Sequence, residues 1–208
     1  MENSLLQQIK QGCNDLDLSL TDQQQIKLQR YVELLLKWNK VYNLTSVRNV
    51  NEMVSRHILD SLAIIPHLKG ESLLDVGTGA GLPGIPIAIA FPDMAVTLLD
   101  TNSKKTRFLQ QAKAELGLNN VTVVHARVEA AELPKFDIIT TRAFASVEDI
   151  IALTGHHCAD EGCLLLMKGV QSDEEIATIG AGFKLDEIVT LSVPECDGQR
   201  HLIRLIKE

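Results

Sequence analysis

The chain has 208 residues, 45% of them hydrophobic, which allows one full core with an appended helical part and no second enzyme domain. Its net charge of -7 at pH 7 argues against an indiscriminate nucleic-acid binder, because affinity for duplexes depends largely on neutralised phosphates. The apolar runs are short and interrupted by proline or charge, and no basic segment leads into an apolar one near residue 1. We therefore expect an unexported, cytoplasmic protein without a membrane span.

The first third of the chain predicts helices. Thr21 and Gln24 have the spacing of a capping box, and an apolar stripe behind them predicts a helix over 21–41. A second stripe predicts a helix over 50–65. We expect residues 1–69 to form a helical extension packed on a core made by residues 70–208. Segment 30–69 holds six basic and three acidic residues, which is weak evidence for a polyanionic partner.

After Gly70 the pattern alternates between strand and helix, which predicts an α/β fold with one seven-stranded sheet. The last two strands are joined by residues 194–200, too few for a parallel crossover, so they should pair antiparallel in a mostly parallel sheet. We expect helices between the first five strands and before the sixth, including 84–91, 103–116, 147–153 and 173–179. The predicted strands are 72–76, 95–99, 121–125, 136–140, 162–167, 188–193 and 201–206.

A glycine-rich turn follows the first predicted strand. The strand contains Asp75, and Gly77, Gly79 and Gly81 alternate after it. Glycines let the backbone turn tightly and approach a ligand where a Cβ would clash. Because a helix should start at about Gly84, the segment predicts a nucleotide pocket at the carboxyl end of the first strand.

Two classes of ligand compete for this turn. A dinucleotide places its pyrophosphate at the helix start, where Asp75 would oppose the negative charge. The ammonium of S-adenosylmethionine is able to use that carboxylate, directly or through water, so the acid favours this cofactor. Gly79, Gly81 and Gly84 nevertheless also satisfy the dinucleotide spacing, and the spacing alone decides nothing.

The second predicted strand ends in another acid, Asp100. It lies 23 residues beyond Gly77, where a carboxylate can accept both hydrogen bonds of a ribose diol. Both competing cofactors contain that sugar, so Asp100 supports an adenosine-type ligand without choosing between them. The alternative is an acid at the amino end of the helix that begins at Ser103.

The four cysteines, at positions 13, 158, 163 and 196, form no Cys-x-x-Cys pair. Residues 156–158, His-His-Cys, are a candidate metal cluster that stands alone. We therefore expect reduced cysteines and no metal site.

Five separated blocks, in the same order along the chain, resemble the bacterial 16S ribosomal RNA guanine-N7 methyltransferases, also called glucose-inhibited division protein B. The resemblance runs nearly end to end, and it implies a Rossmann-like class I methyltransferase sheet with S-adenosylmethionine as cofactor. It also implies 16S ribosomal RNA or the small ribosomal subunit as partner, and we expect a monomer. The blocks are 38–45 (WNKVYNLT), 56–61 (RHILDS), 75–86 (DVGTGAGLPGIP), 141–146 (TRAFAS) and 200–202 (RHL).

The resemblance places the cofactor on particular residues. It matches the glycine turn at Gly77 and Leu82, the Val128-Glu129 pair after the third strand, and Arg142 after the fourth. Val128 is suited to pack on the adenine face while Glu129 meets its amino edge; the alternative is a surface helix start. The predicted cofactor-binding residues are Asp75, Gly77, Gly79, Gly81, Leu82, Asp100, Val128, Glu129 and Arg142.

Guanine N7 has a lone pair and no proton to lose, so no general base is expected and Arg142 is the candidate residue for positioning the reacting groups. Segment 141–144 has neither an Asn-Pro-Pro-Tyr motif nor a nucleophilic cysteine. Other readings remain open at this point: a dinucleotide-dependent oxidoreductase, or a non-catalytic cofactor-binding interaction protein. Candidate RNA contacts are Lys40, Arg56, His57, Phe144, Lys168, Arg200 and His201, with Lys37, Arg48, Lys104, Lys105 and Arg107 as further basic candidates.

Overall fold

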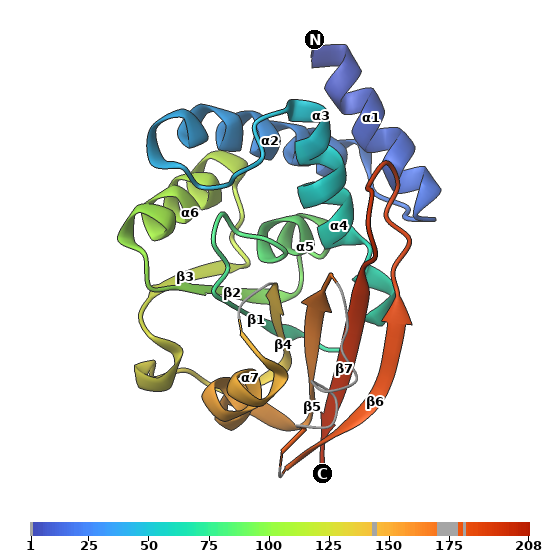
Figure 1. The fold of residues 1–208 in the computed structure, drawn as a ribbon. Helices are drawn as coiled ribbons and strands as arrows, with labels where there is room; N and C mark the ends of the chain where they lie inside the picture. Colours follow the sequence, from blue (N-terminus) through green and yellow to red (C-terminus); the bar gives the residue numbers. More distant parts are fainter. Residues whose placement is uncertain (1, 143–144, 170–178, 181) are drawn as a thin grey trace.

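A computed structural model describes residues 2–142, 145–169, 179–180 and 182–208 (Figure 1). Within them, one sheet has the strand order β3-β2-β1-β4-β5-β7-β6. Strands β1 to β5 pair in parallel, and β7 pairs antiparallel with both β5 and β6, which confirms the predicted mixed sheet. The strands are β1 Ser72–Val76, β2 Ala95–Asp100, β3 Val121–His125, β4 Phe136–Arg142, β5 Cys158–Lys168, β6 Phe183–Thr190 and β7 His201–Lys207.

Helices cover both faces of this sheet, because successive side chains of its central strands point to opposite faces. Leu73 and Ile138 belong to one hydrophobic cluster with helices α1, α2, α5 and α6, whereas Leu74 and Ile139 belong to a second cluster with α7. Helix α5 is buried along its whole length. The bounds of these helices are α1 Glu2–Asp15, α2 Asp22–Tyr42, α5 Gly84–Ala90, α6 Ser103–Leu116 and α7 Val147–Thr154.

Helix α2 packs on α5 and α6, and α1 packs on α2, so that these helices share one core (Figure 1). Helix α2 begins at the predicted capping box, with the Thr21 and Gln24 side chains paired reciprocally. Helix α1 was not predicted, because its sequence is rich in glutamine and has few apolar residues. The helix buries Leu5, Ile9 and Cys13, which lie on one of its faces.

The predicted continuous helix over 50–65 is wrong in detail. The segment is α3 (Val50–Met53), a π-helical stretch η1 (Val54–Leu59), α4 (Asp60–Leu62) and a 3-10 turn η2 (Ile65–His67). The apolar side chains of this segment are buried whether its turns are α-helical or π-helical, so the hydrophobic pattern does not distinguish the two. Short π-helical stretches occur frequently at functional sites.

Three further predictions need correction or lie outside the described residues. Strand β6 begins at Phe183, five residues before the predicted start, because charged side chains at its exposed edge mask the strand pattern. A helix was predicted between β3 and β4, but the structure has only the 3-10 turn η3 (Val128–Ala130) there. A second 3-10 turn, η4 (Gly155–His157), precedes β5. The predicted helix over 173–179 lies outside the described residues except for Ile179.

Among the described helices, none combines the length and the apolar content needed to cross a membrane.

Candidate functional site

The glycine turn after β1 is organised by the buried carboxylate of Asp75. Its Oδ2 accepts hydrogen bonds from the Thr78 hydroxyl (2.6 Å) and from the backbone N–H of Gly84 (2.8 Å). A Cβ at Gly84 would lie 2.8 Å from this same oxygen, and Gly81 has a φ of +93° in a place crowded by Ile85. The strand acid and the glycines therefore form one structural unit that joins β1 to α5.

The second carboxylate oxygen of Asp75, Oδ1, is buried and has no hydrogen-bond partner. Burial raises the pKa of Asp75 to about 7, against the lowering effect of its bonds with Thr78 and Gly84 and of the nearby Arg142 guanidinium. An unpartnered buried carboxylate oxygen attracts a cation, and the ammonium of an amino-acid group is a suitable one.

Asp100, at the end of β2, holds the turn from its other side. Its Oδ2 accepts the backbone N–H of Gly79 (2.9 Å), and its Oδ1 accepts the N–H of Asn102 (2.8 Å), the residue that caps α6. The Lys105 ammonium lies 3.7 Å from Oδ2. Asp100 therefore does have the structural role at the start of α6, and its oxygens keep lone pairs for a further donor.

A third support comes from α2. The hydroxyl of Tyr31, which is fully buried, donates to the carbonyl of Ala80 inside the glycine turn (2.7 Å). Burial raises the pKa of this phenol, so it remains a donor at every physiological pH. Sequence reasoning missed Tyr31, although a tyrosine within an apolar stripe needs a partner for its hydroxyl and that need is a usable signal.

A cavity of about 440 Å³ opens at the carboxyl ends of β1, β2 and β4. We call it the strand-end cavity. Gly77, Asp100, Val128, Glu129 and Arg142, all predicted to bind the cofactor, lie in its wall. Four other predicted residues, Asp75, Gly79, Gly81 and Leu82, build the adjoining turn and are not in the wall. The full wall is Val76, Gly77, Leu99, Asp100, Thr101, Lys105, Arg127, Val128, Glu129, Arg142 and Leu153.

A second cavity, of about 470 Å³, gathers most of the predicted RNA contacts, and Arg142 lies in its wall as well. We call it the basic cavity. Lys40 is exposed on the last turn of α2 and is not in this wall, and Phe144 lies outside the described residues. The wall consists of Thr45, Ser46, Val47, Arg56, His57, Asp60, Arg142, Met167, Lys168, Gly169, Leu191, Arg200 and His201.

Asp60 joins the two arginines of the basic cavity. Its side chain is 5% exposed, and its carboxylate pairs with Arg142 Nη1 (3.2 Å) and with Arg200 Nε (3.1 Å). One buried carboxylate thus fixes two guanidinium groups that are 58 residues apart in the sequence, and each keeps N–H donors free for an acceptor. Sequence reasoning missed Asp60, although it lies in the 56–61 block.

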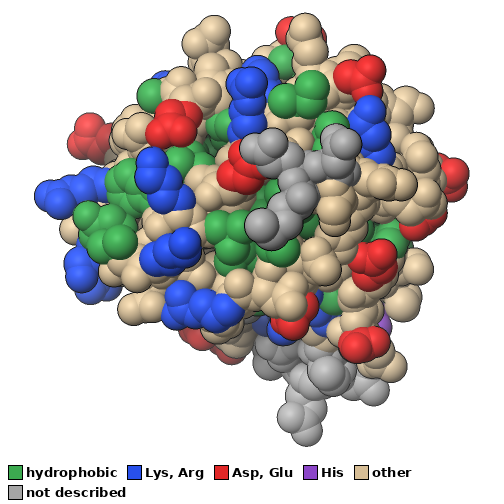
Figure 2. All heavy atoms as spheres, turned by 90° about the horizontal axis from the view of Figure 1, so that it is seen from above, with side chains coloured by type: hydrophobic (Ala, Val, Ile, Leu, Met, Phe, Trp, Pro, Cys, Tyr) green, Lys and Arg blue, Asp and Glu red, His purple; other side chains and the backbone are tan. Residues whose placement is uncertain are grey.

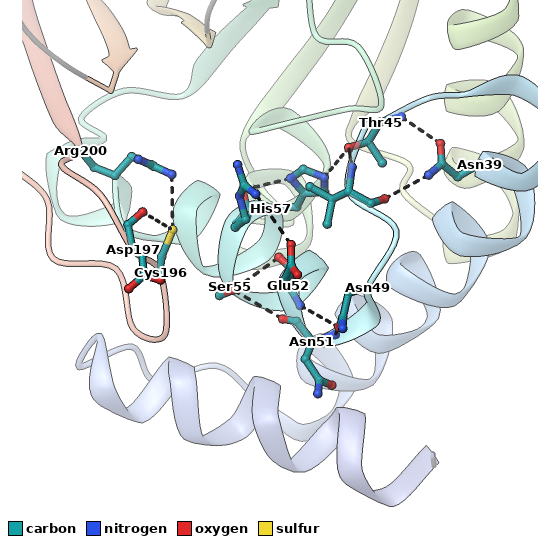
Figure 3. A network of polar contacts seen from close by, with 12 residues as sticks. Asn39, Thr45, Asn49, Asn51, Glu52, Ser55, His57, Cys196, Asp197 and Arg200 are labelled. Carbon is teal, nitrogen blue, oxygen red and sulfur yellow. Dashed lines mark hydrogen bonds and ion pairs between the residues drawn. The ribbon is translucent and has the colours of Figure 1, made fainter.

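His57 is part of the wall but is not a cation. It is 5% exposed, and burial together with the Arg142 charge lowers its pKa to about 4. Its Nδ1–H donates to the carbonyl of Arg56 (3.0 Å), so Nε2 accepts the Thr45 hydroxyl (2.7 Å; Figure 3). The backbone N–H of Thr45 in turn donates to the buried Asn39 amide. His57 therefore anchors the loop after α2.

The other predicted RNA contacts in this wall have structural partners of their own. The Lys168 ammonium donates to the carbonyl of Ala145 (2.7 Å), and His201 Nδ1 bonds the carbonyl of Gly169 (2.9 Å). Arg56 is more than half exposed and lies 3.7 Å from Glu52. Across the described part of the chain, no cluster of three or more His, Cys, Asp or Glu side chains is arranged to hold a metal ion.

Known structures share this fold. A methyltransferase described as SAM-dependent, from Aquifex aeolicus, matches with a TM-score of 0.57 and 17% identity, covering 74% of this chain and 92% of the other. M. jannaschii TYW2 in complex with AdoMet matches with the same TM-score and identity, covering 72% and 74%. The fold is therefore that of the Rossmann-like, S-adenosylmethionine-dependent methyltransferases.

Sequence comparisons narrow this class to a family. Residues 24–203 match the GidB family model, described as rRNA small subunit methyltransferase G. Relatives named ribosomal RNA small subunit methyltransferase G are 51% identical over 201 residues in Chromobacterium violaceum (96% of each chain) and 49% identical over 203 residues in Cronobacter sakazakii (97% and 98%). The chain belongs to the GidB family, which confirms the resemblance seen in the five blocks.

Proposed function

We propose that this chain transfers a methyl group from S-adenosylmethionine to N7 of a guanine in 16S ribosomal RNA, either as free RNA or in the small ribosomal subunit. The observation that carries the proposal is that two cavities meet at one side chain, Arg142. One cavity suits a cofactor and the other suits a nucleotide. The reaction belongs in the cytoplasm, and one copy of the chain supplies both cavities.

The strand-end cavity fits S-adenosylmethionine. The unpartnered Oδ1 of Asp75 suits its ammonium, Asp100 has acceptor capacity for its ribose, and Val128 offers an apolar contact for adenine. Glu129 is exposed in the wall and suits the amino edge of that base. No phosphate is present in this ligand, so the negative charge of Asp75 opposes nothing, in contrast to a dinucleotide.

The basic cavity fits the RNA side. Arg142 and Arg200 are held by Asp60 with donors to spare, which suits the O6 of a guanine or a backbone phosphate. Lys168 and His201 extend the polar wall, and Arg56 lies at its exposed side. A loop base turned out of its stack is the usual target of sequence-specific RNA enzymes, and a concave wall of this size accepts one.

The methyl transfer requires no general base among the side chains. When bound, S-adenosylmethionine supplies an electrophilic methyl group on a sulfonium. Guanine N7 carries no proton, so no group in the wall has to remove one, and neither the neutral His57 nor the doubly paired Asp60 is placed to act as a base. The task of Arg142 is to hold the base and the cofactor side in line across the shared wall.

Residues 1–69 serve both cavities in this proposal. Tyr31 supports the glycine turn, and the segment from Thr45 to Asp60 supplies six of the thirteen residues in the wall of the basic cavity. We therefore treat the helical extension as part of the enzyme and not as a separate module.

Radiolabel transfer tests the proposal. The protein should move labelled methyl groups from S-adenosylmethionine to 16S RNA or to small subunits that lack the modification, and digestion should recover the label as N7-methylguanosine. Absence of label from both substrates, or label on another atom, contradicts the proposal.

A further inference from the structure

We propose that the end of α2 carries a second RNA contact, in which Tyr42, backed by the partly buried Trp38, stacks on an unpaired base of the ribosomal RNA outside the basic cavity. We call the surface made by Trp38, Val41 and Tyr42 the aromatic platform. This inference rests on the proposed function, because it needs an RNA substrate.

Two of the three residues of the aromatic platform, Val41 and Tyr42, are exposed at a helix end, whereas Trp38 is partly buried against the core. The rings of Trp38 and Tyr42 stack with centroids 5.2 Å apart and an interplanar angle of 29°, and Trp38 also packs edge-on against the buried Phe108 at 5.7 Å. Val41 is 71% exposed and Tyr42 is 37% exposed. Large exposed hydrophobic side chains are few among the described residues, and two of them are neighbours here, so the exposure forms a patch.

A cavity of about 470 Å³ opens beside Trp38, between α6 and the edge strand β3. Its wall combines an indole ring with side-chain amides and a guanidinium group. These groups match a nucleotide, since a base stacks on an aromatic ring, bonds amides along its edge and brings a phosphate that pairs with arginine. The wall is Trp38, Thr106, Arg107, Gln110, Gln111, Val123 and His125.

The charge around the aromatic platform favours a polyanion. Lys37, Lys40, Arg48 and Arg107 are all exposed. The Arg48 guanidinium is fixed at the helix end by bonds to the carbonyl of Asn39 and to Asn43 Oδ1 (3.1 and 2.7 Å). Figure 2 shows Lys and Arg side chains gathered on the left half of the face, around exposed hydrophobic side chains. Since the chain as a whole is acidic, this local excess of positive charge indicates RNA as the partner.

The aromatic platform is also close to the basic cavity along the chain. Ser46, in the cavity wall, follows Tyr42 by four residues, so their Cα atoms are at most about 14 Å apart. The connecting loop is held in place by Asn39, whose amide pairs with both Thr45 and Val47. One RNA strand is therefore able to occupy the cavity and the aromatic platform together.

The test compares Tyr42→Leu with Tyr42→Trp. Leucine keeps an apolar surface but removes the ring, whereas tryptophan restores it. We expect Tyr42→Leu to raise the Kd for small ribosomal subunits at least about fivefold, the change that corresponds to a stacking energy of about 1 kcal/mol. Tyr42→Trp and the control Ile26→Ala, at an equally exposed position of the same helix (37%), should stay within about twofold of wild type. Calorimetric affinity for S-adenosylmethionine should be unchanged in all three, which checks the fold.

Unchanged subunit binding by Tyr42→Leu overturns the inference. A photo-reactive amino acid at position 42 supplies a second readout on the bound subunit: an adduct destroyed by ribonuclease supports an RNA contact, and an adduct to a ribosomal protein overturns it. The proposed function and the aromatic platform fail on different results. A wild-type protein that methylates no RNA contradicts the proposed function, whereas normal methylation kinetics in Tyr42→Leu contradict only the aromatic platform.

Discussion

The two main cavities differ in how the chain gathers their residues. The strand-end cavity is built mainly from the carboxyl ends of β1, β2 and β4 and the turn after β3, with Lys105 of α6 and Leu153 of α7 completing the wall. The basic cavity draws on four separated segments, from Thr45 to Asp60, Arg142, Met167 to Gly169, and Leu191 to His201. A parallel sheet brings its carboxyl ends together by topology alone, whereas the second cavity exists only because helices and a hairpin pack around one carboxylate, Asp60.

The largest effect should come from removing the charge of Asp75, which lies in the turn that adjoins the strand-end cavity. Asp75→Asn keeps an acceptor for Thr78 and Gly84 but loses the carboxylate that suits an ammonium. We expect affinity for S-adenosylmethionine to fall by about 3 kcal/mol, more than hundredfold, as when one partner of a buried charge pair is removed. Calorimetric titration measures this, and near wild-type affinity would assign Asp75 a structural role only.

Variants of Arg142 and Arg200 distinguish the two cavities experimentally, because Arg200 lies in one wall and Arg142 lies in both. Arg200→Gln alters only the basic cavity, so kcat/KM for RNA should fall about tenfold to hundredfold while cofactor affinity changes less than about twofold. Arg142→Gln should reduce both, because it lies in both walls. Arg204→Gln, which disrupts an ion pair with Asp186 elsewhere on β7, is the matched control. Equal loss of cofactor affinity in the Arg200 and Arg142 variants contradicts this division.

A pH series tests the strand-end cavity without mutation. Because burial raises the pKa of Asp75 to about 7, the carboxylate ionises as the pH rises through that value. Cofactor affinity should therefore increase by up to about tenfold per unit below pH 7 and level off above it. Affinity in Asp75→Asn should be flat over the same range, and a parallel slope in that variant assigns the titration to another group.

The same ionisation acts on stability in the opposite sense. The folded pKa of Asp75 exceeds its ordinary value of 3.8, so stability that is complete below that value is lost as the pH rises through about 7. His57, whose pKa is lowered from 6.5 to about 4, opposes this fall with a smaller gain in stability that is complete by about pH 7.5. Between pH 6.5 and 8, Tm without ligand should therefore fall in wild type relative to Asp75→Asn.

The smallest expected effect concerns the link between the helical extension and the glycine turn. Tyr31→Phe removes one buried hydrogen bond and leaves the Ala80 carbonyl unpaired, which costs about 1 kcal/mol. In a chain of this size Tm should fall by about 2–4 °C. Calorimetric melting measures this; an unchanged Tm means that Ala80 finds another donor.

The sequence predicted what local patterns encode. The capping box placed the start of α2, and the strand, acid and glycine order placed the turn that Asp75 organises. It predicted the seven-stranded sheet because alternating strands and helices leave few topologies. The partner of a buried side chain is a tertiary fact, however, so the contacts of Asp60 with Arg142 and Arg200 could not be read from spacing. The exposure of Tyr42 is likewise a tertiary fact, because the helical spacing of apolar residues does not show where the packed part of the helix ends.

The position of Arg142 has a thermodynamic consequence. A ligand that engages its guanidinium from one cavity changes the donors and the charge available in the other, so occupancy of the two cavities is coupled. Linkage makes this coupling reciprocal: whatever factor cofactor binding applies to RNA affinity, RNA binding must apply to cofactor affinity.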